Sequence, residues 1–77
     1  MSPELQTIAE EINTLTTVEE CQGYARRMLR LIPPFPEWQA LLSPESIRYA
    51  ECHSGTVRGF YDWMVGKWTG FAGMVIQ

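Results

Sequence analysis

The sequence predicts a small all-α domain, a bundle of three to four helices. Three features support this prediction: apolar residues recur at three- and four-residue spacing, helix-capping residues precede each such stretch, and prolines or glycines interrupt the pattern between stretches. The 77 residues suffice for one domain, which we assign to 1–77. A chain of this size buries only about 60–65% of its unfolded surface, so some apolar side chains should stay exposed.

The first helix is predicted over residues 3–14. Its start, Ser2–Glu4, supplies a hydroxyl cap, a proline suited to the first helical position and an acid that faces the positive end of the helix dipole. Leu5, Ile8 and Ile12 then fall on one face of the helix. That face should pack against the rest of the domain.

A second helix is predicted over residues 18–32. Thr17 and Glu20 have the spacing of a capping box, in which the threonine hydroxyl accepts from the glutamate N–H and the glutamate side chain reaches back. Three arginines lie near the end of this helix, where positive charge suits the dipole. Only a few residues connect the first two helices, so we expect them to form an antiparallel hairpin.

Prolines and a glycine divide the remaining chain. Pro33–Pro36 must end the second helix, and a short helix is expected at 36–42. A long aromatic-rich helix is predicted over 44–70, because Ser43-Pro44-Glu45 repeats the start signal of the first helix. A kink or a split near Gly55 is expected, since glycine inside a helix costs about 1 kcal/mol relative to alanine. Residues 71–77 form an apolar tail.

The predicted core consists of apolar residues on the facing sides of these helices: Leu5, Ile8, Ile12, Val18, Ala25, Met28, Leu29, Ile32, Leu41, Ile47, Val57, Tyr61, Met64 and Trp68. Several large side chains are left over, among them Phe35, Trp38, Phe60, Trp63 and Phe71. A monomer this small can hardly cover all of them, which indicates an apolar surface for contact with another molecule.

The proline-rich loop allows two interpretations. Because prolines stiffen the backbone, Pro33–Pro36 can display Phe35 and Trp38 as anchors for another protein. Alternatively, the two rings fold inward and close the end of the helical hairpin.

Glycines on the long segment raise a similar question. At about 100° per residue, Gly55, Gly59, Gly66 and Gly70 lie on one face, nearly opposite the aromatic stripe. Such a bare face lets another helix approach closely. The competing interpretation is that these glycines only interrupt, loosen and end the helix.

Charge and cysteine content exclude several classes of partner. The net charge is −3 and the bases are not clustered over a large surface, so we expect no nucleic acid partner. The longest uncharged run, 68–77, is far too short for a membrane span. Cys21 and Cys52 follow no signal peptide, so we expect reduced thiols and a cytoplasmic location, with pairing of the two left open.

No catalytic or metal-binding motif is present. Cys52 and His53 are adjacent, and adjacent residues on a helix point about 100° apart, which does not suit a shared proton. Two cysteines and one histidine, widely spaced, also fall short of a zinc site. We therefore expect no enzyme, no cofactor and no metal, and an enzyme that uses Cys52 and His53 is the least favoured hypothesis.

These observations favour a small protein–protein interaction module: an adaptor, regulator or inhibitor that docks to a partner protein, with self-association into a homo-oligomer as a version of the same idea. The expected contact residues are Phe35, Trp38, Trp63, Trp68 and Phe71, with Arg26 and Arg30 as polar partners. The alternative is a binder of a small apolar ligand or chromophore, with the same aromatic rings as its pocket walls.

Overall fold

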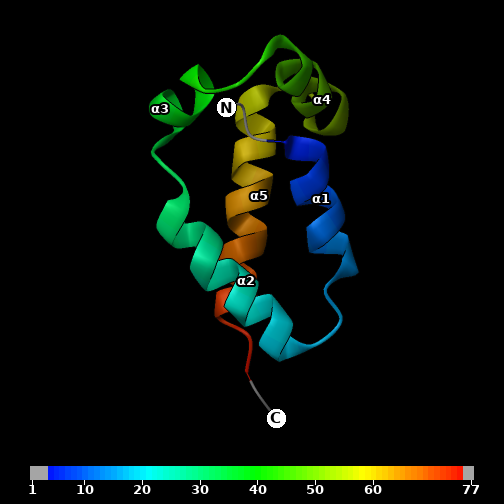
Figure 1. Ribbon diagram of the computed structural model, residues 1–77, viewed down its shortest axis with the longest axis vertical. Helices are drawn as coiled ribbons and strands as arrows, with labels where there is room; N and C mark the ends of the chain where they lie inside the picture. The colour runs from blue at the N-terminus through cyan, green and yellow to red at the C-terminus, as the bar shows by residue number, and fades with distance from the viewer. Residues whose placement is uncertain (1–3, 76–77) are drawn as a thin grey trace.

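Five helices make up residues 4–75, the part of the chain that this computed structural model describes (Figure 1). They are α1 (Leu5–Thr14), α2 (Val18–Leu31), α3 (Phe35–Ala40), α4 (Pro44–Ser54) and α5 (Val57–Ala72). No strand occurs among these described residues. The all-α class is therefore confirmed, whereas the expected number of three to four helices is wrong.

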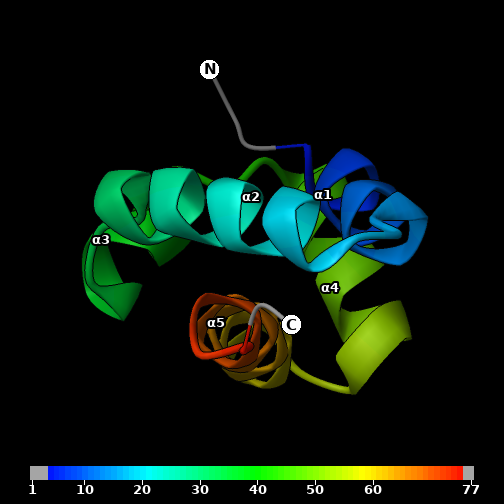
Figure 2. The same cartoon turned by 90° about the horizontal axis from the view of Figure 1, so that it is seen from below.

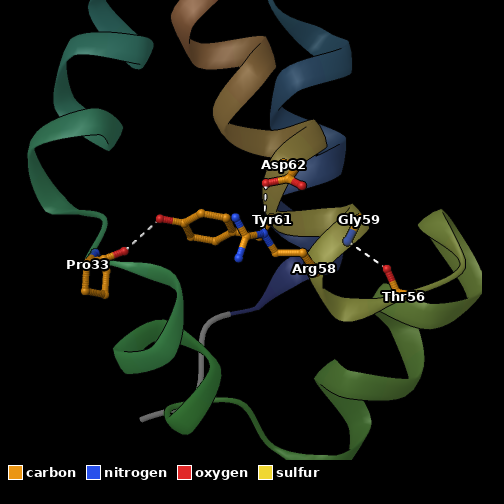
Figure 3. A network of polar contacts seen from close by, with 6 residues as sticks. All are labelled: Pro33, Thr56, Arg58, Gly59, Tyr61 and Asp62. Atoms are coloured by element: carbon orange, nitrogen blue, oxygen red, sulfur yellow. Dashed lines mark hydrogen bonds and ion pairs between the residues drawn. The ribbon is translucent and has the colours of Figure 1, made fainter.

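The helix expected over 44–70 is in fact two helices, α4 and α5. Gly55 ends α4 with a φ of +83°, a conformation that glycine adopts readily, and its N–H donates to the Glu51 carbonyl at 2.8 Å. Thr56 then caps α5, because its hydroxyl accepts from the backbone N–H of Gly59 at 2.8 Å (Figure 3). A glycine stop followed at once by a threonine start separates the two helices completely.

Capping residues begin two further helices as the sequence predicts. The Thr17 hydroxyl accepts from the Glu20 backbone N–H at 3.1 Å, and the Glu20 carboxylate accepts from the Thr16 N–H at 3.3 Å. At the start of α4, the Ser43 hydroxyl accepts from the Ser46 backbone N–H at 3.2 Å. These bonds satisfy backbone donors that have no partner inside the helix.

Other boundaries differ from the predicted ones by a few residues. The start signal expected at Ser2-Pro3 lies outside the described residues. Helix α3 begins one residue earlier than the expected 36–42 and ends two residues sooner. The last helix continues to Ala72, so Phe71 is helical and not part of an extended tail. Of the tail expected at 71–77, only Gly73–Val75 follow the helix within the described residues.

Helix α5 contacts α2, α3 and α4, and α2 packs across it more extensively than any other helix does. Seen end-on, α5 lies below α2, with α3 and α4 to either side (Figures 1 and 2). Helix α4 packs beside α5, α1 packs on α4, and α3 makes a smaller contact with α5. Helices α1 and α2 run in opposite directions but diverge, with α5 visible behind the gap between their ribbons (Figure 1). The two helices have the opposite directions of the expected antiparallel hairpin, but each of them packs mainly on a C-terminal helix and not on the other.

The core contains at least one residue from every helix. Its buried apolar residues are Leu5, Ala9, Ile12, Cys21, Tyr24, Ala25, Trp38, Ala50, Phe60, Met64 and Trp68. Among the predicted core residues, Ile8, Met28, Leu29, Ile32, Val57 and Tyr61 are partly buried and pack against this cluster.

Three residues correct the predicted core. Phe60 and Trp38, which the sequence left outside the core, are 0% and 3% exposed. Leu41, which was expected inside, is 52% exposed. The reason is the early end of α3: the short helix turns Trp38 inward, and Leu41 follows the helix in a turn at the surface.

Candidate functional site

The proline-rich loop packs inward onto α5. The Tyr61 hydroxyl donates to the Pro33 carbonyl at 3.0 Å (Figure 3). The Tyr61 ring also contacts Phe35 and Trp38, with centroid separations of 5.2 and 5.1 Å. The Arg58 guanidinium lies over the Phe35 ring, 4.8 Å from its centre. Of the two interpretations of the loop, the structure supports the inward one.

Most of the residues expected to contact a partner are not free at the surface. Trp68 and Trp38 are 1% and 3% exposed, so neither can reach another protein without rearrangement of the core. Phe35, Trp63 and Phe71 are half-buried. The Trp63 ring, for example, lies 4.5 Å from the ring of His53.

An apolar groove with a volume of about 210 Å³ lies over Trp68 of α5, between side chains of α1, the end of α2, and α3 with the turn that follows it. Trp38 and Trp68 contribute to its lining but are themselves buried. Leu31 and Leu41 also line it, and these side chains are 72% and 52% exposed. The remaining lining residues are Ile8, Met28, Ile32 and Pro33. The groove is thus lined only by apolar residues.

Neither exposed leucine was identified from the sequence as a surface residue. Leu31 lies outside the three- and four-residue repeat of α2 that faces the core, and this was the one available signal. The exposure of Leu41 depends on where α3 ends, which the local pattern did not reveal.

A second, polar depression of about 430 Å³ lies on the outer face of α2. Gly23, Arg26, Arg27 and Arg30 line it together with Leu31, which therefore belongs to both depressions. Arg26 and Arg30 are exposed and form no ion pair with any other described residue. The Arg27 guanidinium lies 5.7 Å from the centre of the Tyr24 ring.

The four glycines expected to form one bare face do not form it. Gly55 terminates α4, so the face is interrupted there. A β-carbon at Gly59 would lie 2.9 Å from the Ser54 carbonyl oxygen, so the junction between α4 and α5 itself requires this glycine. A β-carbon at Gly66 or Gly70 would meet nothing within 4 Å. The break, and not a partner helix, explains the first two glycines.

Two buried polar atoms lie together beside α1. The Tyr24 hydroxyl and the Trp68 indole nitrogen are buried, and neither makes a hydrogen bond of normal geometry with another described residue. Their rings meet edge to face, with centroids 6.4 Å apart. Burial raises the pKa of Tyr24 from 10.0 to about 12, and the nearby Glu11 carboxylate adds to this increase.

This raised pKa predicts a loss of stability in alkaline solution. Between pH 10 and pH 12 the folded protein keeps the Tyr24 proton that the unfolded chain has released, so the free energy of unfolding falls as the pH rises through this interval. Below pH 10 the contribution is complete. Urea denaturation of Tyr24→Phe at pH 9 to 12 should show a shallower decline than wild type. Equal declines in the two proteins would contradict the assignment.

The cysteines and the histidine do not form a reactive cluster. Cys21 is a buried free thiol and Cys52 an exposed one, so the two do not pair. His53 shares a hydrogen bond with the Ser54 hydroxyl at 2.7 Å, and its ring lies edge-on to Phe60 and tilted against Trp63. Within residues 4–75 no group of three histidine, cysteine or acidic side chains is placed to hold a metal ion. No helix in the same part of the chain is long and apolar enough to cross a membrane.

Comparison with protein-family models, with curated proteins and with solved structures found no match to this chain. The apolar groove and the outer face of α2 are therefore interpreted from their own geometry and charge.

Proposed function

We propose that this chain is a protein–protein interaction module, and that the apolar groove receives one or two apolar side chains of a partner protein. The observation that carries this proposal is the pair Leu31 and Leu41, both more than half exposed, beside a groove lined by two buried tryptophans. When a partner covers exposed apolar side chains, the removal of their surface from water favours binding by about 25 cal/mol per Å² of apolar area.

The size of the groove favours a protein partner over a small apolar ligand. Pockets for small molecules commonly measure about 300–1,000 Å³ and enclose most of the ligand surface. The groove measures about 210 Å³ and lies between exposed leucines. It fits a side chain presented by another protein better than a whole chromophore. We also propose that the role is not enzymatic and that it is carried out in the cytoplasm, where the free thiols of Cys21 and Cys52 would stay reduced.

Substitution of Leu41 provides the test. Leu41→Glu places a charge at the edge of the groove and should reduce capture of the partner by at least tenfold, because the charge must be desolvated on binding. Its fold should be retained, since the side chain is already exposed. Val75→Glu is the matched control: it makes the same kind of change at a 77% exposed apolar residue outside the groove.

The measurement is quantitative mass spectrometry of proteins captured from native lysate by wild type and by both variants. A protein captured by wild type and by Val75→Glu, but lost with Leu41→Glu, supports docking through the groove. Equal capture by all three proteins, or no capture by the wild type, would contradict it.

A further inference from the structure

The outer face of α2 has a charge pattern that is complementary to its own reverse. Glu19 and Glu20 lie exposed in the first turn, and Arg26 and Arg27 lie exposed toward the other end. Gly23 lies between the two pairs. Figures 1 and 2 show no other described helix over this face, which points away from α5.

Packing within the chain does not explain Gly23. It lies in the middle of an exposed helix, where glycine destabilises relative to alanine, and its φ is not positive. A β-carbon at this position would meet nothing within 4 Å. A helix surface without a side chain is useful where a second helix approaches closely.

None of the four charged side chains beside Gly23 has a partner of opposite charge within residues 4–75. The only ion pair in the described part of the chain is Arg58–Asp62, on α5. Glu20 is engaged by the backbone N–H of Thr16. Glu19 and Arg26 make no hydrogen bond or ion pair with any other described residue, so both are available to another molecule.

We propose that two copies of the chain pair antiparallel through α2, with a two-fold axis beside Gly23. Glu19 lies four residues before the glycine and Arg26 three residues after it, at distances of about 6 and 4.5 Å along the helix axis. At about 100° per residue, Glu19 and Arg26 are rotated about the helix axis in the same direction from Gly23, by roughly 40° and 60°. Both therefore lie on one side of the glycine. Glu20 and Arg27 occupy the other side in the same way.

A two-fold axis perpendicular to the plane of the two helices makes them antiparallel. It also brings each lateral side of α2 next to the same side of the second copy. Glu19 of one copy therefore meets Arg26 of the second copy, and Glu20 meets Arg27 of the second copy. The symmetry repeats each pair, so every acid in the contact faces a base. A parallel pairing would instead bring like charges together.

Pairs of exposed charges bind weakly and are screened by salt. We expect a dissociation constant on the order of 10–100 μM at low ionic strength, rising at least tenfold in about 0.5 M salt. Leu31 borders both this surface and the apolar groove, whereas Leu41 lines the groove alone. Leu41→Glu therefore tests the proposed function of the groove without changing the residues of the self-pairing surface.

Two single substitutions and their mixture test the pairing by sedimentation equilibrium. Glu19→Arg alone and Arg26→Glu alone should each raise the dissociation constant at least tenfold, because each creates two like-charge contacts per dimer. An equimolar mixture of the two variants should dimerise again, since both contacts then join opposite charges. Arg48→Glu makes the same change in net charge as Arg26→Glu, but on an exposed part of α4, and should dimerise like the wild type.

Gly23→Leu gives a second readout. Because open space surrounds this position, the variant should melt at the wild-type temperature or above it, yet its dissociation constant should rise at least tenfold. A wild type that stays monomeric at 0.5 mM in low salt would overturn the proposal, as would variants that dimerise like the wild type or a mixture that stays monomeric. The two proposals can be told apart with Leu41→Glu. If this variant loses partner capture but still dimerises, the groove is needed for docking and the α2 pairing does not depend on it.

Discussion

Replacement of Trp68 by alanine should unfold a large fraction of the protein at 25 °C. The side chain is 1% exposed, lies on the central helix α5 and contacts Tyr24 of α2. Removing a buried tryptophan leaves a cavity and costs about 3–5 kcal/mol. That cost approaches the whole free energy of unfolding of a domain this small, about 5 kcal/mol. Thermal melting followed by circular dichroism and urea titration would measure the loss.

Leu41→Ala is the control for this substitution. It also removes a large apolar side chain, but one that is 52% exposed, so the free energy of unfolding should fall by less than about 1 kcal/mol. Similar melting temperatures for Trp68→Ala and the wild type would show that Trp68 is not a central core residue in solution.

Phe60→Ala should have the second largest effect, again about 3–5 kcal/mol. Phe60 is 0% exposed and packs between the two C-terminal helices, with Tyr49 and His53 of α4 at centroid separations of 6.0 and 5.1 Å. The substitution therefore removes two of the aromatic contacts between α4 and α5. The urea midpoint should fall far below that of the wild type.

Phe71→Ala provides the matched comparison, because it removes the same side chain from a half-buried position near the end of α5. Its effect on the free energy of unfolding should be clearly smaller. If Phe60→Ala and Phe71→Ala destabilised the protein equally, the placement of Phe60 at the centre of the core would be wrong.

Local signals in the sequence predicted much of the secondary structure. The Thr17 cap, the serine cap at Ser43 and the proline stop at Pro33 all act within a few residues, and the structure confirms each of them. Gly55 was identified as a weak point for the same reason. The chain forms two separate helices there because Gly55 has a positive φ and Thr56 caps the next helix.

The site was harder to predict, because exposure is not a local property. Trp38 was expected only at a docking surface, and Trp68 both in the core and at that surface; both are buried. Leu31 and Leu41, the two leucines that line the groove and remain exposed, were not recognised as surface residues. Which large apolar side chains fill a small core depends on which helices meet, and no spacing within one helix contains that information.

The sequence by itself determined that this protein is helical, where most of its helices begin and end, and that it carries more large apolar side chains than a small core needs. The sequence also placed Leu5, Ile12, Ala25, Met64 and Trp68 in the core, whereas only the tertiary structure decided which of the other apolar side chains join them. An apolar stripe is continuous only along an unbroken helix, and the turn at Gly55 reorients everything after it. Phe60 and Trp68 therefore enter the core from an independent helix, while the early end of α3 leaves Leu41 at the surface.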